Sequence, residues 1–177
     1  FSKSIATYQG FCDVVRTKFG EEFLNSLTLN AGGSTTYPLY EKPDLVNEIS
    51  TASALVKPSD FDVFTLDHHA PATFIAAPVL KMVTNPEIPM AKGLSKVMRK
   101  VGMLPGRACF IYGGNWLAKP CYPADSKRAN ILGHSSNQEM YELKTSDNLQ
   151  VDDFMYFRPT QSEAVFLQFG EIAVYED

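Results

Sequence analysis

The sequence predicts a mainly β chain with some α-helix, in which an antiparallel β-barrel or sandwich follows one helix–strand unit of an α/β layer. Two observations support this fold class. A helical periodicity followed by a single strand occupies the first part of the chain. After Pro43, short segments rich in Val, Ile, Phe and Tyr alternate with Pro, Gly, Asn and Asp, which is typical of a domain built from many short strands.

The first predicted helix begins at Ser4 and ends at Gly20. Apolar residues recur within it at three- and four-residue spacing, namely Ile5, Tyr8, Cys12, Val15 and Phe19. A strand over residues 27–31 follows and runs directly into a glycine turn. Because one such unit cannot form a sheet by itself, we expect residues 1–42 to be an incomplete part of a larger layer.

Residues 43–177 are predicted to form the β domain. Turn-forming residues, such as those at 57–60 and 145–148, separate its candidate strands. These strands are expected at residues 52–56, 61–66, 72–83, 107–112, 138–143, 154–158 and 171–175. One interruption, residues 90–101, has a helical pattern between Pro89 and Gly102.

Composition and charge narrow the classes of function. The 177 residues are 45% hydrophobic and 20% charged, with a net charge of −4, and no basic stripe is interleaved with aromatic residues. A nucleic-acid partner is therefore not expected. No apolar run approaches a membrane span and no signal-peptide pattern opens the chain, so no membrane partner is expected either. Three scattered cysteines without a Cys-x-x-Cys pair indicate reduced thiols in a cytoplasmic protein.

The turn after the first strand is the stretch that most suggests a ligand. It consists of Gly32-Gly33-Ser34-Thr35-Thr36-Tyr37. Glycines let a backbone approach a ligand closely and expose its N–H groups, while Ser and Thr hydroxyls add neutral donors, so such a turn can hold a phosphate. It matches neither a Walker loop nor the Gly-x-Gly-x-x-Gly fingerprint, and a tight structural turn has the same composition.

The histidines do not predict a metal site. Adjacent residues of a strand point to opposite faces, so His68 and His69 could not easily chelate one ion together from a strand. The remaining histidine, His134, lies far away in the sequence. A structural or surface role is therefore expected for the pair, and no metal ligands are assigned.

Glycine-rich or polar turns lie at other predicted strand ends. Residues 112–116 contain two glycines and the single tryptophan, and they could bind a ligand or simply form a hairpin or bulge. Residues 134–139 and 159–163 combine hydroxyls, amides and carboxylates. Strands often position such groups around a site, although solvated turns have the same composition.

Taken in order, these segments resemble the C-terminal part of the pyridoxal-phosphate enzymes typified by D-threonine aldolase and D-serine dehydratase, which belong to the alanine racemase superfamily. The resemblance extends from about Ser26 to the end of the chain and depends on order and spacing. Residues 31–37 resemble the family's phosphate-binding loop, and residues 62–67 and 77–83 resemble two strands beyond it. Its Asp-Ala-Gly, Ser-Glu-Glu-His and Pro-x-His-x-Cys motifs correspond to residues 111–115, 136–139 and 159–163.

This resemblance implies a fold, a cofactor and a substrate class. Residues 1–42 would be the last helix–strand unit of a (β/α)8 barrel, and residues 43–177 would be the superfamily's β domain. Pyridoxal 5'-phosphate would be held through its phosphate by Gly32, Gly33, Ser34 and Thr35. The substrate would be a small amino acid that reacts at its α-carbon, in a homodimer whose subunits share the active site.

Departures from the family pattern change the catalytic assignments. Gln161 and Glu163 replace the family's metal-binding His and Cys, so a zinc site is not expected there, and a harder ion such as Mg²⁺ or Mn²⁺ would bind only weakly. Glu139 replaces the family's histidine. His134 either takes over the role of that histidine or is a surface residue. The catalytic candidates are then Glu139, Gln161 and Glu163. Loss of the metal ligands favours a metal-free racemase, or another reaction at the α-carbon, over a metal-assisted aldolase or dehydratase.

The resemblance also implies that a residue is missing. The family's Schiff-base lysine lies upstream of every residue present, and neither Lys81 nor Lys119 occurs in its context. Since the chain also begins with Phe1 and not Met, we expect an inactive fragment of a longer enzyme. It either self-associates through uncovered apolar faces, or its first roughly 25 residues repack on the β domain. The alternatives are a non-catalytic β module that kept the scaffold and lost the chemistry, and a stand-alone anion-binding domain.

Overall fold

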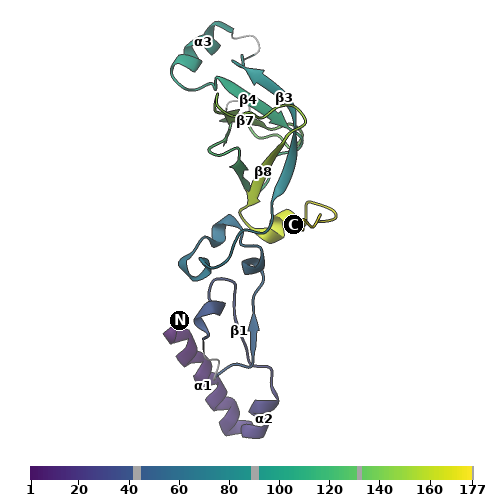
Figure 1. Cartoon of the computed structure of the whole chain (residues 1–177). Helices are drawn as coiled ribbons and strands as arrows, with labels where there is room; N and C mark the ends of the chain where they lie inside the picture. Colours follow the sequence, from purple (N-terminus) through teal and green to yellow (C-terminus); the bar gives the residue numbers. More distant parts are fainter. Residues whose placement is uncertain (42–44, 89–91, 131–132, 177) are drawn as a thin grey trace. The chain divides into compact units, whose positions relative to one another are not determined.

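The computed structural model describes residues 1–41, 45–88, 92–130 and 133–176 (Figure 1). The chain divides into two compact units, Phe1–Ala72 and Thr73–Asp177. It is a mixed α/β structure, and the second unit contains a six-stranded antiparallel sheet that curls into a nearly closed barrel. The domain boundary expected at residues 42 and 43 lies outside the described residues.

The first unit begins with two consecutive helices, α1 (Ser2–Phe19) and α2 (Glu21–Ser26). Gly20, with a φ of 88°, ends α1 where the sequence predicted a stop. The helix begins earlier than expected, because Phe1 rather than Ser4 is its N-cap residue and no side chain caps it. Cys12 in the predicted apolar stripe is buried, whereas Phe19 at the end of the stripe is exposed.

Two short strands run parallel in this unit, β1 (Asn30–Gly32) and β2 (Glu48–Ser50). Short 3-10 turns make up the other regular elements: η1 (Tyr37–Leu39), η2 (Ser53–Leu55), η3 (Ser59–Phe61) and η4 (Phe64–Leu66). The part of this unit that the structure describes therefore contains a two-stranded parallel sheet, and it shows no eight-stranded barrel.

The strands predicted at residues 52–56 and 61–66 are wrong, because η2, η3 and η4 occupy these segments. Each turn is closed by a local backbone hydrogen bond, such as that from the Leu66 amide to the Val63 carbonyl at 2.9 Å. Ala54 and Leu66 are fully buried in these turns. Short apolar segments predict burial, but their composition alone does not distinguish a strand from a compact turn.

The second unit is built on one sheet with strand order β5-β8-β3-β4-β7-β6. The strands are β3 (Ile75–Thr84), β4 (Arg107–Ile111), β5 (Ala118–Tyr122), β6 (Lys127–Arg128), β7 (Met140–Leu143) and β8 (Phe154–Pro159). Four predicted strands are confirmed, as β3, β4, β7 and β8, and all neighbouring pairs run antiparallel. Figure 1 shows β3 extending along much of this unit, between β8 and β4.

Two helices accompany the sheet. α3 (Lys92–Lys100) confirms the helix predicted at residues 90–101, although residues 90 and 91 lie outside the described part. α4 (Ser162–Phe166) follows β8. The strand predicted at residues 171–175 is wrong, because this segment is exposed and has no strand partner. Its apolar residues, Ile172, Val174 and Tyr175, are more than half exposed.

The core of the second unit lies on one face of the sheet. Along β3, Ile75, Ala77 and Val79 alternate into this core, as the two-residue period of a strand requires. Phe157 of β8 is fully buried there, and its ring lies 5.5 Å from that of Trp116, centroid to centroid. Ala108, Ala129 and Met140 form a second, smaller buried cluster, against which Phe110 packs.

Candidate functional site

The turn after β1 is held in shape by its own hydrogen bonds. The Gly33 amide donates to the Ser50 carbonyl at 2.8 Å, so the turn leaves β1 against the end of β2. The Thr36 hydroxyl donates to the Gly32 carbonyl at 2.7 Å, and the Thr36 and Tyr37 amides donate to the Gly33 carbonyl at 3.0 and 2.9 Å. These bonds fix the backbone of residues 32–37 independently of any ligand.

This turn is also tied to two other segments. The Ser34 hydroxyl accepts a hydrogen bond from the Ala52 amide at 3.2 Å, which joins the turns after β1 and β2. The Thr65 hydroxyl donates to the Thr35 carbonyl at 2.7 Å. Because β1 and β2 are parallel, both turns lie at the carboxyl ends of their strands, where α/β proteins bind their ligands.

The hydrogen-bond donors of this turn that are not used within the protein determine which ligand it can bind. The Gly33 amide is engaged by Ser50, whereas the amides of Ser34 and Thr35 have no acceptor among the residues that the structure describes. The Ser34 hydroxyl acts as an acceptor toward Ala52, so its own hydrogen is available for donation. Thr35 is exposed and adds a second hydroxyl. Two amides and two hydroxyls are neutral donors of the kind that fits a phosphate group.

In the second unit, Glu139 is a buried carboxylate surrounded by donors. Its side chain is 2% exposed. Its Oε2 accepts hydrogen bonds from the Tyr141 hydroxyl at 2.8 Å and from the Asn115 amide at 3.0 Å, and its Oε1 lies 3.0 Å from Nδ1 of His134. Burial, followed by the bond to Glu139, raises the pKa of the Tyr141 hydroxyl, so this group stays protonated and donates.

Two glycines make room for this arrangement. A Cβ on Gly114 would lie 2.3 Å from the Ser135 carbonyl oxygen and 2.4 Å from the Glu139 Cβ. A Cβ on Gly113 would lie 2.4 Å from the Trp116 ring. Both glycines have positive φ, at 85° and 140° for residues 113 and 114. The turn over residues 112–116 thus packs closely around Glu139 and Trp116. Its glycines have a structural role, as opposed to the ligand-binding role that the sequence also allowed.

His134 is the partly exposed member of the cluster around Glu139. Its side chain is 52% exposed, and a guanidinium nitrogen of Arg128 contacts both of its ring nitrogens. A buried carboxylate bonded to Nδ1 of an exposed imidazole orients that ring, as in many acid–base pairs. His134 therefore lies next to Glu139 and is not an isolated surface residue.

The other two catalytic candidates lie at the start of α4. Gln161 is the N-cap residue of this helix, without a side-chain capping bond, and both Gln161 and Glu163 are exposed. Ser162 between them is buried. Glu139, by contrast, is bonded to Asn115, His134 and Tyr141. The structure thus places one of the three candidates inside a hydrogen-bonded cluster and the other two on an exposed helix start.

His68 and His69 are not on a strand, which corrects the premise used to separate them. His68 lies in a turn after η4, and both imidazoles face the hydroxyl of Tyr37. The Nε2 of His68 is 3.1 Å from that oxygen, and the Nε2 of His69 contacts it as well. Among the described residues, no group of three His, Cys, Asp or Glu side chains is placed to hold a metal ion.

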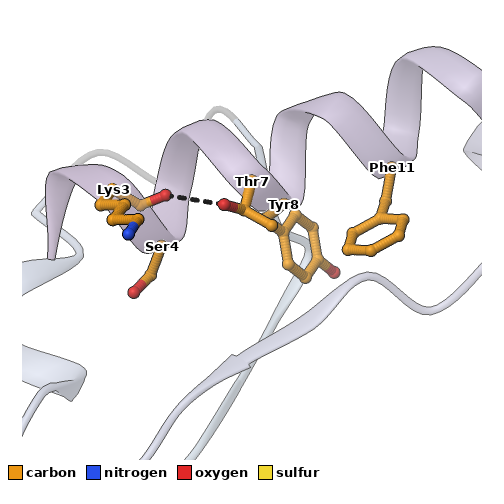
Figure 2. A pocket seen from close by; sticks show the side chains of 5 residues that line it. All are labelled: Lys3, Ser4, Thr7, Tyr8 and Phe11. Atoms are coloured by element: carbon orange, nitrogen blue, oxygen red, sulfur yellow. Dashed lines mark hydrogen bonds between the residues drawn. The ribbon is translucent and has the colours of Figure 1, made fainter.

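A shallow pocket of about 350 Å³ lies along one side of α1. Figure 2 shows that its side chains, Lys3, Ser4, Thr7, Tyr8 and Phe11, all come from this helix. The Thr7 hydroxyl donates to the Lys3 carbonyl within the helix at 3.0 Å. The lining is mostly apolar and includes none of the predicted site residues, so this pocket is not a candidate for the cofactor site.

The comparisons with known proteins add no family to these observations. No protein-family model matches the chain, and none of the curated proteins or solved structures is significantly similar to it. Within the described ranges, no helix combines the length and apolar character needed to cross a membrane. The function is therefore argued from the residues themselves.

Tyr141 and Arg128 were missed in the sequence, and Tyr37 was named only as the end of the glycine turn. Glu139 and Tyr141 are two positions apart, so their sharing one face could have been predicted from the strand period. Arg128 and Tyr37 gave no such signal, because their partners are brought to them by turns and by strand pairing. The sequence alone did not predict that Tyr37 would meet both histidines.

Proposed function

We propose that this chain is the C-terminal part of a pyridoxal-phosphate-dependent enzyme that acts at the α-carbon of an amino acid, in the manner of the alanine racemase superfamily. In this proposal the first unit is the last part of a (β/α)8 barrel, and the turn after β1 binds the cofactor phosphate. When bound, pyridoxal phosphate supplies the electron sink for reactions at the α-carbon. The metal-assisted aldolase and dehydratase reactions are not proposed.

The single observation that carries this proposal is the tie between the turns after β1 and β2. The Ser34 hydroxyl accepts from the Ala52 amide, while the amides of Ser34 and Thr35 have no acceptor among the described residues. Phosphate sites in barrel enzymes commonly use loop amides at the carboxyl ends of neighbouring strands. Parallel strands occur almost only in sheets covered on both faces by further elements, so the proposal predicts that β1 and β2 belong to a larger parallel sheet.

Within this proposal, Glu139 and His134 are the acid–base candidates of the second unit. The carboxylate of Glu139 is fixed by Tyr141 and Asn115, and it orients the imidazole of His134. An oriented and partly exposed imidazole can accept or deliver a proton. Gln161 and Glu163 are exposed and remain candidates for contacts with the polar groups of an amino acid.

The phosphate site can be tested with pyridoxamine 5'-phosphate, which has no aldehyde and so does not react with surface lysines. Calorimetric titration of the chain would compare this ligand with pyridoxamine and with inorganic phosphate. We expect pyridoxamine 5'-phosphate to bind most tightly and pyridoxamine not to bind measurably. We expect Ser34→Ala to weaken binding about tenfold, since a charge-assisted hydrogen bond and the tie to Ala52 are lost together.

A matched control is Ser26→Ala, which removes a hydroxyl that only bonds the Phe23 carbonyl at the end of α2. This variant should bind like the parent chain. Equal affinity for inorganic phosphate and pyridoxamine 5'-phosphate would contradict the cofactor and leave an anion-binding domain. Absence of binding to both ligands would contradict the whole proposal and favour a non-catalytic module.

A further inference from the structure

Tyr37 brings three potential metal-ligating atoms together in the first unit. Its hydroxyl oxygen faces the Nε2 atoms of both His68 and His69, and the two imidazole rings lie 4.5 Å apart, centroid to centroid. The Tyr37 ring also lies edge-on to both imidazoles, with its centroid 6.4 Å from that of His68 and 5.9 Å from that of His69. Two ring nitrogens therefore lie next to one phenol oxygen.

We propose that Tyr37, His68 and His69 bind a divalent transition-metal ion, with Cu²⁺ as the tightest binder. Imidazole and oxygen donors suit Cu²⁺ and Ni²⁺, and the affinities of such sites rise toward Cu²⁺ along the first-row series. The ion takes two neutral imidazoles and the phenolate of Tyr37, and the phenol proton is released to solvent. Remaining coordination positions are filled by water. This proposal does not rest on the proposed cofactor function.

One donor spacing matches that in a coordination shell, and the contact between Nε2 of His69 and the Tyr37 oxygen has to widen when an ion enters. Ligands about 2.0–2.1 Å from a metal lie roughly 3 Å from one another when they are adjacent in its coordination shell. The 3.1 Å between Nε2 of His68 and the Tyr37 oxygen matches such an edge. His68 is exposed, so an ion can enter from solvent, whereas His69 and Tyr37 are half-buried.

The backbone on both sides of the site is held by other bonds. The buried Lys57 ammonium donates to the His69 carbonyl at 2.8 Å, and the His69 amide donates to the Leu66 carbonyl at 3.0 Å. On the other side, η1 begins at Tyr37, whose amide is bonded to Gly33. Both halves of the site are thus positioned before an ion binds, which lowers the ordering cost of coordination.

The test is titration of the chain with Cu²⁺, followed by visible absorption. The exposed Cys121 is first replaced by Ser in every sample, because a free thiol binds and reduces copper. We expect one equivalent of Cu²⁺ to bind, with a phenolate-to-copper charge-transfer band. Tyr37→Phe should abolish this band and weaken binding about tenfold or more, while its ring contacts with the histidines are kept.

Two further variants distinguish this site from incidental surface binding. His69→Gln should weaken binding at least as strongly as Tyr37→Phe, since a nitrogen ligand is lost. Tyr40→Phe removes another phenol of the first unit and His134→Gln removes an imidazole of the second unit, and both should leave the band and the affinity unchanged. The proposal would be overturned if the chain bound copper without a phenolate band. It would also be overturned if His134→Gln lost the band as completely as Tyr37→Phe does.

Discussion

Gly32 ends β1 so close to β2 that a Cβ placed on it would lie 2.6 Å from the Ser50 carbonyl oxygen. Its φ of 114° is also one that other residues rarely adopt. A substitution here would push the two strand ends apart and strain the backbone at the same time. The candidate phosphate turn therefore depends on a glycine for a geometric reason that holds whether or not a ligand binds.

Gly32→Ala is expected to destabilise the first unit by about 1–3 kcal/mol, the usual range for backbone strain of this kind. Amide hydrogen exchange measures this locally, and residues 30–37 should exchange faster than in the parent chain. Gly10→Ala is the matched control, because nothing lies within 4 Å of the Cβ it adds to α1. Removing a helical glycine should stabilise α1 by about 0.5–1 kcal/mol. Equal effects of the two substitutions would contradict the role of Gly32.

The extent to which the sequence predicted this fold differs between the two units. In the second unit, β3, β4, β7 and β8 have an alternating or continuous apolar pattern, and they were found close to their true bounds. β5 was missed because Pro120 lies within it and because its exposed positions give no apolar signal. In the first unit, η2 and η4 contain buried apolar residues, so their composition predicts strands, whereas local hydrogen bonds close them as 3-10 turns.

The candidate sites were predictable only where local sequence determines them. The turn at residues 32–37 was found because its glycines and hydroxyls are contiguous. The contact of Tyr37 with His68 and His69 spans about thirty residues and depends on η4, a segment whose composition predicts a strand. The bonds among Arg128, His134 and Glu139 likewise depend on the pairing of β6 with β7.

The buried bond between Tyr141 and Glu139 should contribute measurably to the stability of the second unit. Tyr141→Phe removes one of the two donors to Oε2 of Glu139, and it should cost about 1–3 kcal/mol because a buried carboxylate then keeps only the Asn115 amide on that oxygen. Trp116 is the only tryptophan and packs against Phe157, so its fluorescence follows urea unfolding of this unit alone. Tyr175→Phe is the control, since this residue is 87% exposed, and it should unfold like the parent chain.

The stability of the second unit should decrease at alkaline pH. Burial raises the pKa of the Cys109 thiol from 9.0 to about 12, and burial also raises that of Tyr141. A raised pKa means that the folded chain binds the proton more tightly than the unfolded chain. The resulting stabilisation is fully present below about pH 9 and is lost as the pH rises toward 12.

Urea unfolding followed through Trp116 at about pH 8 and about pH 10.5 measures this loss. The free energy of unfolding should be lower at the higher pH, and Cys109→Ala should make the difference smaller although it weakens the core at both values. A thiol reagent at pH 8 should modify the exposed Cys121 and leave Cys109 unmodified until the unit unfolds. Rapid modification of Cys109 in the folded chain would contradict its burial.

Arg107 holds the loop that connects β7 to β8. Its guanidinium donates to the Leu149 carbonyl at 2.7 Å and also contacts the carbonyl of Asp147, while its backbone lies in β4 opposite Leu143. A planar guanidinium reaches both carbonyls at once, whereas an ammonium cannot. Arg107→Lys should therefore destabilise the second unit by about 1–2 kcal/mol and speed the exchange of residues 144–150.

Lys144→Gln provides the comparison in the same loop. It breaks the ion pair with Asp125, in which both side chains are more than half exposed, so solvent screens the interaction. The urea midpoint of this variant should be indistinguishable from that of the parent chain, although it removes a full charge. If Lys144→Gln lowered the urea midpoint as much as Arg107→Lys, ion pairing would account for the stability of this loop. The hydrogen bonds from the Arg107 guanidinium to the two carbonyls would then not be needed, and the role proposed for Arg107 would be wrong.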